Sequence, residues 1–386
     1  MMLKFEFKNP TRIVFGEGQI AALRSLILPG RRVFILYGGG SIKRNGVYDQ
    51  VVHALAGYAL TEFGGIEVNP HYETILRAAE AARASDADLI LAVGGGSVID
   101  AAKFLASAVT ATNRDPWDDF AAGNYPQEIL PIGCILTLPA TGSESNIVSV
   151  VSSTVRNLKI PFANEAARPT FAIMDPSTMA SLDKRQLGNG VVDAFTHVVE
   201  QYLTVPGNTP VQYGFSEVLL RTLIEWGPRL LDDSSPEARE NVMWAANQAL
   251  NGLIGAGVRQ DWSTHMIGHA ITALYGLDHA RTLSLVMPSL LRFKASTKQM
   301  MLTRYGRNVW GVTAADDRPA AEEAIDLTED FFHRMGLPVK MTDISPIEIS
   351  TDDVVAHLQR AGHVQLGEMA DITPTQVREI LAHTAG

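Results

Sequence analysis

Several histidines in this sequence are spaced so that they could hold a metal ion. Asp193 and His197 are four residues apart, as are His265 and His269, so each pair shares one face of a predicted helix. His279 follows His265 by fourteen residues, which places three of the ten histidines within fifteen positions. Neutral imidazole together with carboxylate suits Zn(II) or Fe(II). Spacing alone leaves a metal site and ordinary helical histidines equally open.

Other catalytic side-chain patterns are poorly supported. His265 and His269 have the spacing of a zinc-protease helix, but Met266 stands where that helix carries the glutamate that acts as base. Cys134, the single cysteine, lies in an apolar run and is predicted to be a buried small hydrophobic residue rather than a nucleophile.

The sequence GGGS occurs twice, at residues 38–41 and 94–97, each time between a predicted strand and a predicted helix. Glycine lets backbone N–H groups approach a phosphate, and the following helix N-terminus adds a partial positive charge. The spacing is not G-x-G-x-x-G, and either loop alone could be a tight turn. Two such loops on neighbouring strands favour a dinucleotide site. Asp100, just inside the second helix, could be a cap, a surface charge or a ligand contact.

The first glycine loop also bears on the choice of cofactor. NAD-selective sites usually place a carboxylate near the adenosine ribose, where it repels a 2′-phosphate. Residues 37–44 contain no carboxylate and offer Ser41, Lys43 and Arg44, which suit a phosphate. The two basic residues could instead be solvated side chains of a first helical turn. The pattern favours NADPH over NADH.

The predicted secondary structure that positions these residues changes near residue 180, from alternating strands and helices to helices alone. Before it, short apolar runs alternate with helical patterns, which predicts a Rossmann-like parallel sheet covered by helices. Predicted strands cover residues 31–40, 59–65 and 88–97, and residues 131–145 are predicted to be a strand that runs into a polar loop. Predicted helices cover residues 41–57, 73–87 and 97–110. Beyond it, helices are predicted at residues 188–203, 211–231, 236–255, 262–276, 282–296 and 319–336. We therefore predict an α/β dinucleotide-binding domain over residues 1–180 and an all-helical metal-binding domain over residues 181–386.

Composition narrows the possible partners and location. The 386 residues carry a formal net charge of −10, which does not favour nucleic acid or an anionic membrane. The N-terminus lacks the apolar core of a signal peptide, and no apolar run approaches a membrane span. One cysteine cannot form an internal disulfide. These features predict a cytoplasmic enzyme.

Several longer motifs, taken in order, closely resemble the iron-containing (group III) alcohol dehydrogenase family, and within it the NADPH-dependent aldehyde reductase/butanol dehydrogenase branch. They are TRIVFGEG at residues 11–18, AVGGGSVIDAAK at 92–103, TLPATGSESN at 137–146, GVVDAFTHVVEQY at 190–202 and STHMIGHAITALYGLDHA at 263–280. The resemblance implies a dehydroquinate-synthase-like architecture of two domains, and at least a homodimer.

The resemblance also assigns residues. It implies that the metal, Fe(II) or Zn(II), is held by Asp193, His197, His265 and His279, with His269 nearby as a non-ligand. The implied contacts to NADP(H) are Gly38, Gly39, Ser41, Asn69, Gly94, Gly95, Gly96, Ser97, Asp100, Thr137, Leu138, Thr141, Asn146 and Lys159, to which the sequence itself adds Lys43. Asp278 and Trp262 depart from the usual family pattern and could change the local charge and the width of the pocket.

The activity that follows from the resemblance is reversible, metal-dependent reduction of a small aldehyde to a primary alcohol by hydride from NADPH, with His269 as a proton relay. Two alternatives are a dehydroquinate-synthase-like lyase and a non-catalytic module that binds metal and nucleotide. The lyase would need a strongly basic pocket, whereas the region near His265 offers mainly Arg259 and Arg281.

Overall fold

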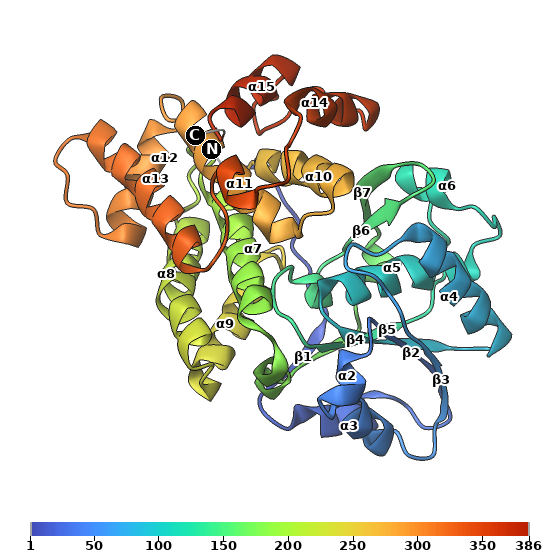
Figure 1. The fold of residues 1–386 in the computed structure, drawn as a ribbon. Coiled ribbons are helices and arrows are strands. Elements are labelled where there is room, and N and C mark those ends of the chain that lie inside the picture. Colours follow the sequence, from blue (N-terminus) through green and yellow to red (C-terminus); the bar gives the residue numbers. More distant parts are fainter. Residues whose placement is uncertain (1, 385–386) are drawn as a thin grey trace. The chain divides into compact units, whose positions relative to one another are not determined.

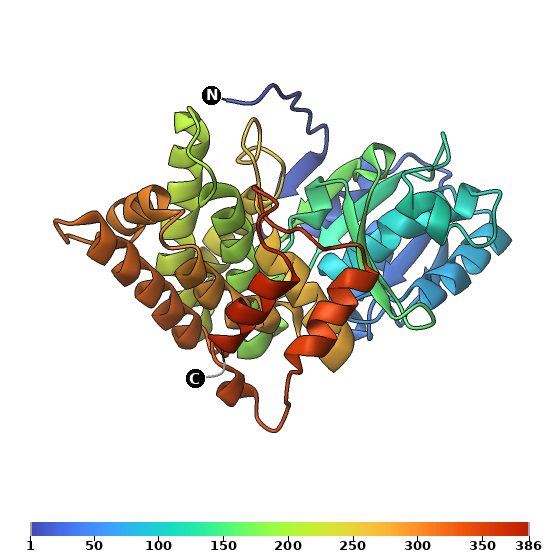
Figure 2. The ribbon, with the colours of Figure 1, turned by 90° about the horizontal axis from the view of Figure 1, so that it is seen from above.

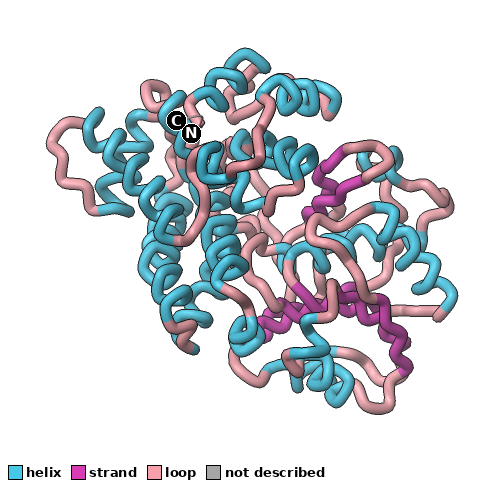
Figure 3. Tube along the Cα trace, in the orientation of Figure 1, coloured by secondary structure: helices cyan, strands magenta, loops and turns pink. Residues whose placement is uncertain are grey.

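The computed structural model describes residues 2–384, which form two compact units (Figure 1). One unit spans residues 8–182 and contains all the strands, and the other joins residues 2–7 to residues 183–384 and is helical (Figure 3). Within the described part of the chain, no helix is long and apolar enough to cross a membrane.

The α/β unit is built on a six-stranded parallel sheet in the order β1-β8-β5-β4-β2-β3. Its strands are β1 (Arg12–Phe15), β2 (Arg32–Tyr37), β3 (Ala59–Phe63), β4 (Leu89–Gly94), β5 (Ile132–Leu136) and β8 (Phe171–Met174). Its helices are α1 (Leu23–Leu26), α2 (Ser41–Arg44), α3 (Val47–Ala54), α4 (Tyr72–Ala84), α5 (Gly96–Thr110) and α6 (Trp117–Ala121). Helices α2 and α3 cover one face of the sheet, and α4 and α5 cover the other (Figure 1). This double cover explains why the central strands are apolar throughout.

The order of the strands creates a switch point beside both glycine loops. From β2 the chain moves outward to β3 and then returns to form β4 on the other side of β2. Tyr37 pairs with Val93, and Gly94 pairs with Leu136, so β2, β4 and β5 end at the same edge. Open α/β sheets bind their ligands at this edge, where the strand order reverses.

The sequence predicts β2, β3, β4 and β5 but misses β1, β8 and an antiparallel hairpin of β6 (Val148–Ser153) and β7 (Leu158–Ala163). The missed parallel strands have only four residues each, too few to show a pattern. The helix predicted over residues 41–57 is divided into α2 and α3, because Gly46 adopts a φ of 80° between them. Cys134 is fully buried in β5, as the sequence predicts.

Among its described residues, the helical unit contains six α-helices that the sequence predicts and three that it does not predict. The predicted ones are α7 (Lys184–Tyr202), α8 (Pro210–Asp232), α9 (Pro236–Ala249), α10 (Ser263–Tyr275), α11 (His279–Phe293) and α13 (Asp317–Arg334). The others are α12 (Gln299–Tyr305), α14 (Thr351–Arg360) and α15 (Pro374–Ala382). Helix α9 ends at Ala249, although the sequence predicts that it continues to residue 255.

Helix α7 lies in the core of this unit. Its first turn is fixed by a capping box, in which the Asp183 carboxylate accepts from Gln186 N at 2.8 Å and the Gln186 side chain accepts from Asp183 N. From Leu187 to Tyr202 nearly every residue is buried. A helix that is buried on all sides can carry polar side chains only where they find partners, so its few charged residues mark a site.

Two glycines give a matched test of this packing. A Cβ at residue 188 in α7 would collide with the carbonyl oxygen of Met335, whereas a Cβ at Gly214 in α8 would meet no atom within 4 Å. We expect Gly188→Ala to destabilise the protein by about 1–3 kcal/mol and Gly214→Ala to stabilise it by about 0.5–1 kcal/mol. Urea unfolding of both variants measures the difference. Equal effects of the two substitutions would contradict the close packing of α7.

Candidate metal centre and dinucleotide site

The predicted ligands on α7 and α10 converge on one point. Asp193, His197 and His265 are all buried, and one potential ligand atom from each lies within 4.8 Å of the others. His197 Nδ1 and His265 Nε2 each lie 3.8 Å from Asp193 Oδ1. Neither nitrogen has a hydrogen-bond partner among the described residues. Buried nitrogens left without hydrogen bonds around a carboxylate oxygen fit a metal ion that would bind them all.

His279 and His269 lie next to this group. His279 begins α11, and its Nε2 is 3.7 Å from Asp193 Oδ1, so all three histidines among the predicted ligands lie around the Asp193 carboxylate. The ring of His269 is 4.8 Å from that of His279 and 6.1 Å from that of His265. Gly268 makes this arrangement possible, because a Cβ there would lie 2.9 Å from Thr282 Oγ1 on α11.

The electrostatics of the two central histidines differ. Burial lowers the pKa of His197 to about 4, so this ring is neutral at pH 7 and able to bind a metal. Burial also opposes charge on His265, but the carboxylates of Glu200 and Asp193 outweigh it and raise the pKa to about 9. A metal that binds His265 must therefore displace a proton from it.

Sequence reasoning missed Glu200, which lies on α7 and contacts the ring of His265 through its Oε2. The contact joins residues 65 positions apart. The one signal available in the sequence is the position of Glu200 three residues after His197, which places both on the same face of the helix.

Asp278, which departs from the family pattern, has a defined structural role. Its Oδ2 accepts hydrogen bonds from Arg185 Nε at 2.7 Å and from Asn189 Nδ2 at 2.8 Å, both on α7. Asp278 is also the residue that precedes α11, directly before His279. These bonds tie the turn that carries His279 to α7, one helical turn before Asp193.

Trp262, the other residue that departs from the usual family pattern, packs against the group of predicted metal ligands (Asp193, His197, His265 and His279), which we call the metal group. Its ring packs edge-on against His265 at 5.4 Å and against His197 at 6.1 Å. The residue has a φ of 64°, a strained conformation for a tryptophan, and its Nε1 donates to Gln260 Oε1 at 2.8 Å. The ring is therefore held in place beside two of the predicted ligands.

In the α/β unit, the glycines of the second glycine loop allow the loop after β4 to contact the loop after β5, because they have no Cβ atoms. A Cβ on Gly95 would lie 3.1 Å from Leu138 Cβ, and one on Gly96 would lie 2.5 Å from Thr141 Oγ1. Thr137 N also donates to Gly94 O at 3.0 Å. The loops after β4 and β5, both predicted to contact the cofactor, are thus brought together at the switch point.

Three more predicted contacts gather at the same edge of the sheet. Lys159 Nζ donates to Asn69 Oδ1 at 2.7 Å, and Asn69 N donates to Ser97 Oγ at 3.3 Å. Asn69 has a φ of 59°, a left-handed conformation that asparagine tolerates better than most residues. The structure therefore joins residues from three distant segments of the sequence around the start of α5.

Asp100 is buried and committed to internal hydrogen bonds. Its Oδ1 accepts from Ser143 Oγ at 2.5 Å, and its Oδ2 accepts from Val150 N at 3.0 Å. Burial raises the pKa of this carboxyl group. The bonds hold α5 to the segment after β5, so Asp100 shapes the loop, and its direct contact with a cofactor stays a prediction.

Lys103, which sequence reasoning missed, supports the same loop. Its buried Nζ donates to Ser143 Oγ, Asn146 Oδ1 and Val148 O, each at 2.8 Å. Burial lowers its pKa to about 8. Asn146 in turn donates to Thr141 O at 3.1 Å, so the lysine fixes two predicted cofactor contacts.

In the first glycine loop, Gly39 has free space around it, whereas Lys43, in the helix that follows, forms an ion pair. A Cβ at Gly39 would meet no atom within 4 Å, and Ser41 begins α2. Lys43 Nζ is paired with Glu62 Oε2 at 2.9 Å and lies near the rings of Tyr37 and Tyr48. Glu62, on β3, is a carboxylate that the local sequence pattern does not place near this loop.

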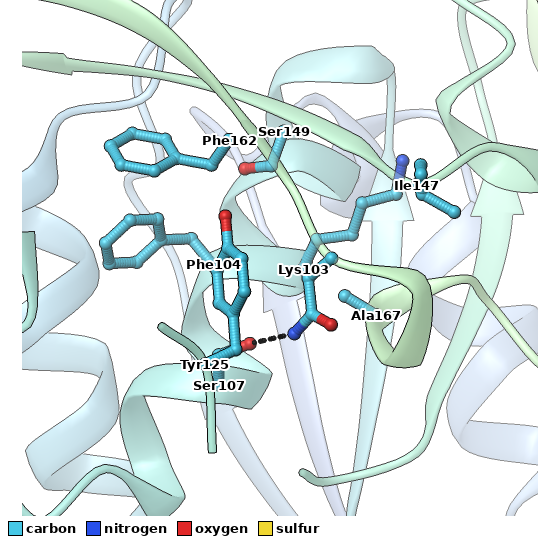
Figure 4. Close-up of a pocket in the computed structure, with 9 residues that line it drawn as sticks. Lys103, Phe104, Ser107, Tyr125, Ile147, Ser149, Phe162 and Ala167 are labelled. Atoms are coloured by element: carbon cyan, nitrogen blue, oxygen red, sulfur yellow. Dashed lines mark hydrogen bonds between the residues drawn. The ribbon is translucent and has the colours of Figure 1, made fainter. Parts of the chain in front are cut away.

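A small pocket lies against α5 (Figure 4). Lys103, Phe104, Tyr125 and Phe162 are among its lining residues, and it has room for about one water molecule. None of the predicted contacts to the dinucleotide lines it. Its volume is too small for a substrate.

The fold agrees with the comparisons with known families. A model of the iron-containing alcohol dehydrogenase family matches residues 10–176, and a model of the C-terminal domain of the Fe-containing alcohol dehydrogenase family matches residues 189–385. The chain belongs to the iron-containing alcohol dehydrogenase family.

Among its relatives, the NADPH-dependent aldehyde reductase YqhD of Escherichia coli is 47% identical over 98% of this chain and 99% of that protein. The NADH-dependent butanol dehydrogenase A of Clostridium acetobutylicum is 34% identical over 98% of both chains. The crystal structure of E. coli YqhD matches with a TM-score of 0.97 and 46% identity over 99% of both chains. That of NADH-dependent butanol dehydrogenase A from Thermotoga maritima matches with a TM-score of 0.95 and 33% identity, covering 100% of this chain and 99% of that one.

Substitutions at Asp193 and His269 separate a metal ligand from a neighbouring histidine. We expect Asp193→Ala to lose bound metal and most activity, because it removes the carboxylate that the histidines share. We expect His269→Ala to keep its metal and its affinity for NADPH but to lose about a hundred-fold to ten-thousand-fold in kcat, as for a proton relay. Metal analysis of both purified variants and steady-state kinetics measure these effects. Full metal occupancy in Asp193→Ala would refute the ligand assignment, and metal loss in His269→Ala would make His269 a ligand.

Proposed function

We propose that this protein reduces small aldehydes to primary alcohols with NADPH at a metal centre, and that it catalyses the reverse oxidation. The observation that carries the proposal is the convergence of a carboxylate and three imidazoles on Asp193 Oδ1, in a chain whose glycine loops flank the switch point of a parallel sheet. A bound divalent metal supplies a Lewis acid for the carbonyl oxygen, and NADPH supplies the hydride.

The residues of the chain have separate tasks in this proposal. Asp193, His197, His265 and His279 hold Fe(II) or Zn(II), since one carboxylate and three neutral imidazoles suit either ion. His269 moves a proton between solvent and the alcohol oxygen. The support for this task is the position of His269 beside the predicted ligands, with its ring 4.8 Å from that of His279.

Aldehyde-dependent loss of NADPH absorbance tests the activity. We expect turnover with simple aldehydes in the metal-loaded protein, none after removal of the metal by a chelator, and recovery with Fe(II) or Zn(II). A dehydroquinate-synthase-like lyase would show no net oxidation of NADPH, and a non-catalytic binding module would turn over no aldehyde.

We expect NADPH to be preferred over NADH, because residues 38–41 after β2 contain no carboxylate to repel the 2′-phosphate, and the nearby Glu62 carboxylate is paired with Lys43. Gly39→Asp should reverse the preference, and the open space around residue 39 accommodates the new side chain. Gly39→Asn is the matched control, since it adds nearly the same volume without the charge. The ratio of kcat/KM for the two cofactors measures the effect. Equal values for both cofactors in the unmodified protein would contradict the preference.

We propose that the protein is a homodimer. The N-terminal arm, residues 2–7, has no regular secondary structure (Figure 2). It belongs to the helical unit, in which Leu3 N donates a hydrogen bond to Gly257 O at 3.0 Å. It leaves the apolar side chains of Met2, Leu3, Phe5 and Phe7 between 41% and 51% exposed. An exposed apolar cluster of this kind supports a protein–protein interface. A monomer mass in sedimentation analysis would contradict the dimer.

We further propose a cytoplasmic location. The support is the single cysteine, Cys134, which is buried and has no other cysteine with which to form an internal disulfide.

A further inference from the structure

Glu200 is a buried carboxylate that the proposed chemistry does not use directly. It lies on α7, three residues after His197 and seven after Asp193, and it is 4% exposed. A carboxylate taken out of water is costly unless hydrogen bonds or opposite charge compensate it. The hydrogen-bond partners of Glu200 therefore indicate its role.

One oxygen of Glu200 holds the start of α10. Its Oε1 accepts from Thr264 N at 2.6 Å and from His265 N at 3.4 Å. These are among the first N–H groups of the helix, which have no partner inside it. A negative charge at this end also interacts favourably with the helix dipole. Glu200 thus fixes the end of the helix that carries His265.

The other oxygen holds the ring of the same histidine. Glu200 Oε2 contacts His265 Nδ1, and this leaves His265 Nε2 facing Asp193 Oδ1 at 3.8 Å. A carboxylate on Nδ1 favours the tautomer that has its proton on that nitrogen. The lone pair then lies on Nε2, where a metal ligand needs it.

We propose that Glu200 is a positioning residue of the metal centre, which sets both the place of α10 and the tautomer of His265. The proposal rests on the metal assignment made above. It makes the affinity for metal depend on a side chain that does not touch the metal. A purely structural carboxylate would affect the stability of the protein and leave metal affinity unchanged.

Glu200→Gln separates the two roles. The amide oxygen can still accept from Thr264 N, so the start of α10 keeps its cap. The amide NH2 then faces His265 Nδ1 and favours the tautomer with the proton on Nε2, which cannot bind a metal. The variant should therefore lose more in metal binding than in folding.

A matched control exists at Glu217 on α8, in the same unit. This buried carboxylate accepts from Tyr202 Oη at 2.8 Å and from Arg304 Nε at 2.7 Å, and neither partner is a predicted ligand. Glu217→Gln disturbs a buried carboxylate network away from the metal group. It should lower the melting temperature without changing metal affinity.

The experiment measures the affinity of the full-length proteins for Zn(II) and Co(II) by competition with a chelator. We expect Glu200→Gln to bind both ions about 10-fold to 100-fold more weakly than the unmodified protein. Its Co(II) complex should show altered visible absorption, while its affinity for NADPH is unchanged. Glu200→Asp, which keeps the carboxylate, should recover most of the affinity and is the second variant if Glu200→Gln does not fold.

Unchanged metal affinity and an unchanged Co(II) spectrum in Glu200→Gln would overturn the proposal, even if the melting temperature falls. Equal weakening in Glu200→Gln and Glu217→Gln would also overturn it, since it would reduce both effects to stability. Asp193→Ala distinguishes this failure from that of the proposed function. If that variant loses metal and Glu200→Gln does not, only the role of Glu200 is wrong. If both bind metal normally, the metal assignment itself is wrong.

Discussion

One face of helix α7 determines the arrangement of the metal group. Arg185, Asn189, Asp193 and His197 follow one another at intervals of four residues, and Glu200 continues the same face. The helix supplies two predicted ligands itself. It also holds the two that it does not supply, through the contact of Glu200 with His265 and the bonds of Arg185 and Asn189 to Asp278, beside His279. Helix α7 therefore sets the positions of the predicted ligands on α10 and α11 as well as its own.

The residues predicted to contact the dinucleotide are held in place in a different way. Here the absence of Cβ atoms at Gly95 and Gly96 lets loops after neighbouring strands come into contact. The buried Lys103 then locks the second loop through three hydrogen bonds. Both arrangements share one principle, since each functional side chain is fixed by groups that do no chemistry themselves.

The sequence best predicts the relative positions of residues that are close together along the chain. Asp193 and His197 share a helix face whatever the fold, so their proximity follows from spacing. The convergence of His265 and His279 on these two residues depends on how the helices pack. The sequence predicts it only through the resemblance to a known family. Glu200, Lys103 and Glu62 were missed because each acts through a residue at least 19 positions away. No periodicity encodes such a pair. The strands β1 and β8 were missed for the opposite reason, because four residues are too few to show a period.

The charges around α7 explain why a divalent ion suits this group. Asp193 and Glu200 are both 4% exposed and contribute two negative charges, while imidazoles that bind a metal are neutral and contribute none. Two buried carboxylates would otherwise cost several kcal/mol each, although bound protons and hydrogen bonds reduce this cost. An ion of charge +2 balances them without any further basic residue. The lysines and arginines of this unit can therefore serve elsewhere, as Arg185 does at Asp278. A divalent metal held by these residues would balance the two carboxylates and would also supply a Lewis acid, which a lysine or arginine side chain in the same place could not.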